Sequence, residues 1–141
     1  MTIPQWVLLG FAAWTLLVLF TTIGPYRWAR ILTGRARIGE WRADEPQGSE
    51  WYRRAMRAHA NCVENLPVYG AIVVCATAAG AESDALDLLA LVFMAGRICQ
   101  TVTHLALPAS DSAAALRFAF FFLQVICMVA MGIEVALLAN R

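Results

Sequence analysis

The sequence contains no lysine, and charged residues make up only 15% of its 141 residues. A soluble globular domain carries roughly 25% charged residues and ~45–50% apolar ones, whereas this chain is 60% hydrophobic. The apolar residues form long runs at 3–23, 86–107 and 113–138, and a fourth stretch, 52–79, is apolar mainly in its second half. Since a membrane-spanning helix needs ~20 such residues, we expect an all-α membrane protein with four spanning helices in one domain, residues 1–141.

The chain also lacks the alternation of apolar and polar residues that marks the strands of an outer-membrane barrel. Its start has no basic segment of the kind that precedes a cleaved signal peptide, so the first apolar run should be retained. The turns between the last three helices are short, which favours antiparallel neighbours in an up-down bundle. Residues 33–50 form the one connection long enough to cover a site. The Gly24-Pro25 pair predicts a kink or an end in the first helix, which can continue to Leu32.

Cysteines are few and carry no recognisable metal or disulfide pattern. All four lie within the expected helices, and they form neither a CxxC pair nor a zinc spacing. We interpret them as small packing residues and expect no metal site: Cys62, Cys75, Cys99 and Cys127. The chain shows no nucleotide-binding motif and nothing that suggests a nucleic acid partner.

Positive charge is absent from most of the chain. Eight of the eleven arginines lie between Arg27 and Arg57, whereas the turn at 80–87 is acidic and has no basic residue. The positive-inside rule therefore predicts that residues 33–50 are cytoplasmic and that both termini face outward. A bacterial inner membrane is the location we expect.

Polar residues inside membrane helices are costly, at ~2.5–3.5 kcal/mol for a charged side chain, so they mark functional sites or packing pairs. In the second helix Arg53, Arg57, Asn61 and Glu64 follow helical spacing and share one face. We expect Arg57 and Glu64 to share hydrogen bonds with Asn61, directly or through water. His59 lies on the opposite side of this helix and should serve a different neighbour, as an interfacial histidine or as part of a site.

Two further polar faces follow in the third and fourth helices. Arg97, Gln100, Thr101 and His104 share one face of the third helix by their spacing. In the fourth helix Arg117 lies just inside the cytoplasmic boundary of the membrane. There its side chain can either extend to the membrane surface or form part of a site. The phenylalanines that follow it at 118–122 suit contact with lipid or packing.

Three segments resemble the MAPEG family, the membrane-associated proteins in eicosanoid and glutathione metabolism. The sequence RAMRAHANCVENLPVY at 54–69 is similar to the family's second-helix pattern R-A-H-x-N-x-x-E with a following proline and aromatic residue. The segment FMAGRICQTVTH at 93–104 resembles its third-helix G-R-x-x-x-T motif, and TGRAR at 33–37 resembles the end of its first helix. With the four-helix layout, the resemblance covers nearly the whole chain.

The resemblance implies a homotrimer that holds glutathione between neighbouring subunits, close to the cytoplasmic face. By position it implies that Arg57, Asn61 and Glu64 bind the tripeptide, that Arg37 contributes from the first helix, and that Arg117 supports the thiolate. The expected binding set is completed by the other polar residues of these faces: Arg53, His59, Arg97, Gln100 and His104. The sequence differs from some catalytic members of the family. Those members carry a serine or tyrosine at the positions of Phe118 and Phe121, and a tyrosine at the position of His104.

Three functions compete at this point. The first is a glutathione-dependent transferase or peroxidase acting on apolar electrophiles or lipid hydroperoxides. The second is a non-catalytic trimer that binds and presents a lipid. The third, a small four-helix drug exporter, needs an acidic residue inside its first helix, and residues 3–23 contain none. The combination of Arg57, Asn61, Glu64 and Arg117 favours the first, because lipid presentation alone needs no such polar set.

Overall fold

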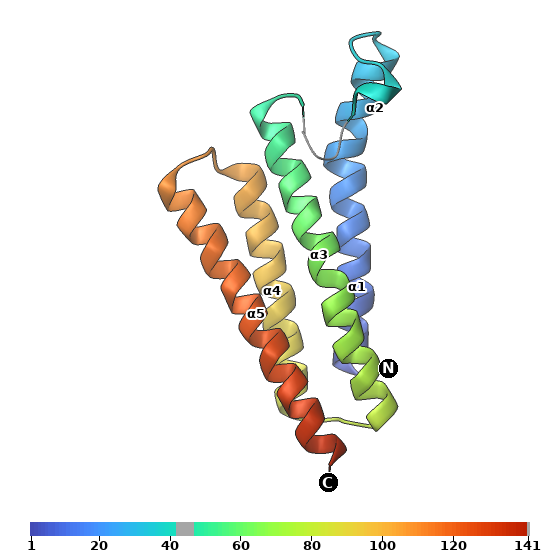
Figure 1. Cartoon of the computed structure of the whole chain (residues 1–141), viewed down its shortest axis with the longest axis vertical. Coiled ribbons are helices and arrows are strands. Elements are labelled where there is room, and N and C mark those ends of the chain that lie inside the picture. Colours follow the sequence, from blue (N-terminus) through green and yellow to red (C-terminus); the bar gives the residue numbers. More distant parts are fainter. Residues whose placement is uncertain (42–46, 141) are drawn as a thin grey trace.

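The computed structural model describes residues 1–41 and 47–140 and contains four helices that are long and apolar enough to cross a membrane. They run up and down as a bundle, with both termini at the same end (Figure 1). The first comprises α1 (Ile3–Val18), η1 (Leu19–Ile23) and α2 (Gly24–Leu32); a short helix η2 (Ile38–Glu40), α3 (Glu50–Ala79), α4 (Asp84–Ala106) and α5 (Asp111–Ala139) follow. The predicted four-helix membrane fold is confirmed; Pro46 of the long connection lies outside the described residues.

The helix ends are set by local capping residues. Ser49, Ser83 and Ser110 each precede a helix, and each hydroxyl accepts a hydrogen bond from a backbone N–H three residues on. Such caps satisfy amide groups that have no partner within the helix. At the other end of α3, Gly80 takes a φ of 62°, a left-handed conformation that glycine adopts without strain. With these caps the three helices begin at Glu50, Asp84 and Asp111.

The first helix continues past Gly24-Pro25 instead of ending there. Proline lacks the N–H that an α-helix would use at this point, and the chain accommodates it with a π-helical turn over Leu19–Ile23 directly before it. The helix then runs on as α2 to Leu32, so this segment rises beyond the ends of α3, α4 and α5 in Figure 1.

The core of the bundle is built around aromatic rings. Phe11 of α1 packs edge-on against Phe93 of α4, and Phe93 stacks on Tyr69 of α3 with ring centroids 4.4 Å apart. The Tyr69 hydroxyl donates to the carbonyl of Pro4, which satisfies its polar atom inside the core. Many large apolar side chains point outward instead, as expected for a surface that faces lipid.

A second cluster fastens the long connection to the bundle. The Arg27 Nε donates to the Tyr52 hydroxyl at 2.6 Å, and its guanidinium lies 5.4 Å from the centre of the Trp41 ring. Tyr26 stacks on Tyr52, and its hydroxyl accepts from the backbone N–H of Ser49. The two ends of the connection are therefore held beside α2 and the start of α3.

Candidate functional site

A polar cleft opens at the end of the bundle where α3 and α5 begin and α4 ends. Its volume is about 740 Å³, within the range of small-molecule sites. Polar and charged side chains from these three helices dominate its lining: Glu50, Arg53, Arg54, Met56, Arg57, Ala60, Asn61, Glu64, His104, Ala109 and Arg117. Six of the residues singled out from the sequence thus meet in one place: Arg53, Arg57, Asn61, Glu64, His104 and Arg117.

The spacing along α3 builds one wall of this cleft. Arg53, Arg57, Asn61 and Glu64 recur every three or four residues and so share a face of the helix. Arg53, Arg57 and Glu64 are exposed in the single chain, and Asn61 is half-buried. These charged groups are therefore available to a ligand or to a second chain.

Asn61 contacts α4 rather than its neighbours on α3. Its Nδ2 lies 3.3 Å from Nε2 of His104. Within the described residues the structure shows no hydrogen bond from Asn61 to Arg57 or Glu64, so the expected sharing along α3 is not formed directly in this chain. An asparagine N–H facing Nε2 implies that this ring nitrogen accepts and that Nδ1 carries the proton. The Nδ1 atom is buried and has no partner within the described part of the chain.

Arg117 reaches the cleft from α5 and is anchored to the end of α4. Its Nη2 donates to the carbonyl of Leu107 at 2.8 Å, and its own carbonyl accepts from Nε2 of Gln100. Pro108 follows Leu107, and α4 ends at Ala106, so the Leu107 carbonyl is free to accept. The anchor fixes the guanidinium at the cleft, with further N–H donors on the same fork.

Comparison with known proteins identifies the family of this chain. A model of the MAPEG family matches residues 6–137. The chain belongs to the MAPEG family. No curated protein and no solved structure matches it in the same comparisons. Membership makes this a membrane protein of the family associated with glutathione and eicosanoid metabolism.

The predicted site did not include Arg54 and Glu50, which also line the cleft. Arg54 Nε donates to the carbonyl of His104 at 3.1 Å, and its Nη1 pairs with Glu50 across one helical turn. Arg54 is the first residue of the MAPEG-like segment at 54–69, and the resemblance could therefore have indicated it as a site residue. Its spacing of three residues from Arg57 and seven from Asn61 also places it on their face of α3, and Glu50, eleven residues before Asn61, lies on that face too.

Arg97 and Gln100, also predicted to bind the ligand, do not line the cleft in this MAPEG chain. Arg97 is fully buried, its Nη1 donates to Gln100 Oε1 at 2.9 Å, and its guanidinium lies 5.5 Å from the Phe11 ring centre. Gln124 of α5 donates to the same Gln100 oxygen. These residues form a polar network inside the bundle that joins α4 to α5 and reaches α1.

Arg37 and His59 also lie away from the cleft. Arg37 is exposed and directly precedes η2, beyond the end of the first helix. His59 is half-buried on α3 and is not among the cleft-lining residues. Within one chain, neither reaches the other candidate residues, and their assignment to ligand binding stays a prediction.

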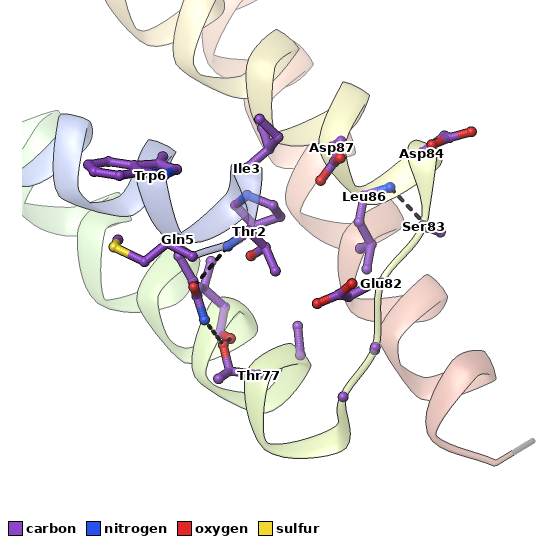
Figure 2. Close-up of a pocket in the computed structure, with 16 residues that line it drawn as sticks. Thr2, Ile3, Gln5, Trp6, Thr77, Glu82, Ser83, Asp84, Leu86 and Asp87 are labelled. Carbon is purple, nitrogen blue, oxygen red and sulfur yellow. Dashed lines mark hydrogen bonds between the residues drawn. The ribbon is translucent and has the colours of Figure 1, made fainter.

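A second hollow lies at the opposite end of the bundle. Its volume is about 590 Å³, and it is bounded by the start of α1, the end of α3 and the start of α4. Figure 2 shows the carboxylates of Glu82, Asp84 and Asp87 on one side and Thr2 and Gln5 on the other. The described lining residues include no arginine. Among residues 1–41 and 47–140, no group of three or more His, Cys, Asp or Glu side chains is placed to hold a metal ion.

Proposed function

We propose that this MAPEG protein is a membrane-embedded, glutathione-dependent transferase or peroxidase acting on apolar electrophiles or lipid hydroperoxides. The observation that carries the proposal is the convergence of four arginines, two glutamates, an asparagine and a histidine on one cleft of about 740 Å³. Glutathione has two carboxylates, an ammonium group and a thiol, so its charges complement this lining.

The lining divides into groups suited to different parts of glutathione. Arg53 and Arg57 are exposed along α3, and an arginine fork binds a carboxylate through two parallel hydrogen bonds. Glu64 is also exposed and suits the ammonium group. Arg54 is already paired with Glu50, so we assign it to holding the cleft together rather than to the tripeptide.

Arg117 is the group we assign to the thiol. A cation beside sulfur favours the thiolate, which is the reactive nucleophile. In the transferase reaction the thiol releases its proton to water, the thiolate sulfur bonds to the electrophilic carbon, and the leaving group departs with the electron pair of its bond. In the peroxidase reaction the thiolate attacks a peroxide oxygen, the O–O bond breaks to give an alcohol, and a second glutathione converts the resulting sulfenic acid into the disulfide and water.

An apolar substrate has a direct route from the bilayer to Arg117. Phe118 is 66% exposed, and its ring stacks on that of Phe122 one turn further along α5. These rings stand on the lipid-facing surface of the helix that carries Arg117. A hydrophobic electrophile or lipid hydroperoxide can therefore approach the thiolate laterally, without crossing water.

We further propose a homotrimer, because exposed charges on a membrane-spanning helix are costly against lipid. Arg57 and Glu64 are exposed in the single chain, and a neighbouring subunit would cover them. Such an arrangement also places the cleft between subunits and brings segments such as the one carrying Arg37 within reach of a neighbour's site.

The alternative is a non-catalytic lipid-binding trimer of the same family. The observation in its favour is that Phe118 and Phe121 provide no hydroxyl beside Arg117, so activation of the thiol rests on one guanidinium.

Titration of the detergent-purified protein with glutathione tests the proposal. We expect saturable binding with the ultraviolet absorbance of a thiolate at a pH where free glutathione is mostly thiol. S-methylglutathione, which cannot ionise at sulfur, should bind without that absorbance. In native mass spectrometry the same preparation should have the mass of three chains. Monomers alone would contradict the trimer, and the absence of both binding and turnover would favour the lipid-binding alternative.

A further inference from the structure

The end of the first helix extends beyond the thickness of a membrane. The continuous helical segment Ile3–Leu32 has 30 residues, which corresponds to ~45 Å at 1.5 Å per residue. The hydrocarbon core of a bilayer is only ~30 Å thick. Because the apolar part begins at the N-terminal end of the segment, the excess falls on α2, which also rises above the other helices in Figure 1. Its last turns therefore lie at the level of the lipid headgroups.

The surface of this projecting part combines apolar and cationic groups. No residue of α2 is buried, and Trp28 and Leu32, one turn apart on the same face, are 59% and 79% exposed. Tryptophan favours the boundary between hydrocarbon and headgroups. Arg30 lies between them in sequence, and its guanidinium sits over the Tyr26 ring with one nitrogen donating to the Tyr26 hydroxyl at 3.3 Å.

The chain turns back immediately after α2 and brings a second arginine to the same place. Gly34 has a φ of 65°, a left-handed conformation that suits glycine. The turn allows the backbone N–H groups of Arg35 and Ala36 to donate to the carbonyl of Arg30. Arg30 and Arg35 then line one small hollow of about 70 Å³, together with Ala36, Glu40, Trp41 and Gln47.

We propose that this tip of α2, defined by Trp28, Arg30, Leu32 and Arg35, binds the headgroup of an anionic phospholipid of the surrounding bilayer. Arg30 and Arg35 hold the phosphate, for which the planar guanidinium is well suited, while Trp28 and Leu32 contact the upper acyl chains. Glu40 lines the same hollow and opposes a further anion, so the two arginines outweigh it by one charge. The site is separate from the arginine cleft, and the two share no residue.

A local fluorescence measurement tests this proposal. Thr33→Cys, in a background with the four native cysteines replaced by alanine, carries a fluorophore beside the tip; Thr33 is exposed and is not one of the four residues of the site. The protein is placed in nanodiscs containing phosphatidylglycerol or phosphatidylcholine with a nitroxide high on the acyl chain. We expect phosphatidylglycerol to quench at lower mole fraction, and Arg30→Gln with Arg35→Gln to reduce that preference about fivefold per arginine removed.

A fluorophore at the other end of the bundle separates a site from a general charge effect. Placed at Asp84→Cys, at the acidic end, it should show no preference for phosphatidylglycerol. The proposal is overturned if the two lipids quench equally at position 33, or if position 84 shows the same preference as position 33. Displacement of phosphatidylglycerol by millimolar inorganic phosphate would also overturn it and indicate a site for soluble phosphate. If the double variant fails to assemble, Arg35→Gln alone tests the proposal, because Arg35 is exposed and its replacement should not disturb the fold.

Discussion

The two ends of the bundle carry hollows of similar size and opposite charge, and the charges differ in how well they suit the helix that carries them. At the acidic end, Asp84 and Asp87 stand in the first turn of α4, where the positive end of the helix dipole favours carboxylates. At the other end, Arg53 lies in the first turn of α3, where the same dipole disfavours a cation. The acids thus stabilise their own helix, whereas Arg53 reduces the stability of its helix and calls for a partner elsewhere. That difference favours the arginine cleft over the acidic hollow as the proposed functional site.

The largest expected effect concerns the sides of the membrane on which these two ends lie. In a cysteine-free background, Ser49→Cys stands beside the arginine cleft and Glu82→Cys beside the acidic hollow. From the arginine asymmetry, an impermeant thiol reagent added to intact cells should label position 82 and leave position 49 unlabelled until the membrane is opened. The reverse pattern would invert the proposed topology. Labelling of both positions in intact cells would contradict the prediction that the two ends lie on opposite sides of the membrane.

Removal of Arg117 should have the next largest effect. We expect Arg117→Ala to abolish the thiolate absorbance and lower kcat about 100-fold or more, the loss typical when a preorganised charge-stabilising donor is removed. Glutathione affinity should remain largely intact, because the carboxylates are assigned to Arg53 and Arg57. Arg117→Lys keeps a cation and should retain part of the signal.

The acidic hollow supplies the matched control for this experiment. Asp87→Asn changes the charge by one unit at the opposite end of the bundle and should leave absorbance and turnover as in the wild type. If Arg117→Ala keeps the full thiolate signal, the assignment of Arg117 is wrong.

Arg57 should give a smaller effect, and one of a different kind. Loss of a charge-assisted hydrogen bond costs ~1.5 kcal/mol or more, so Arg57→Ala should weaken glutathione binding about tenfold, as measured by equilibrium titration. The thiolate absorbance at saturation should be retained, since Arg117 is unchanged. Raising the salt concentration should weaken wild-type binding more than that of Arg57→Ala, because the variant has lost one screened interaction. An unchanged affinity in Arg57→Ala would remove this residue from the binding set.

The sequence alone was sufficient for the helices and their ends. The length of an apolar run decides whether a segment spans the membrane, and Ser49, Ser83 and Ser110 cap helices through contacts three residues away. The grouping of Arg53, Arg57, Asn61 and Glu64 was equally accessible, because it depends only on the 3.6-residue period of one helix. The MAPEG-like segment at 54–69 likewise indicates the family through the order of its residues, which requires no tertiary contact.

Only the tertiary structure separated residues that one helix face had grouped together. Arg97 and His104 share a face of α4, but seven residues place them ~10 Å apart along its axis. Arg97 therefore meets Phe11 and Gln100 inside the bundle, whereas His104 meets Asn61 at the cleft. The anchoring of Arg117 by the Leu107 carbonyl and the enclosure of Arg27 by Trp41 and Tyr52 likewise join residues from different helices or from the long connection. Helical periodicity fixes the direction of a side chain around its own axis, and what that side chain meets depends on how the neighbouring helices cross at its height.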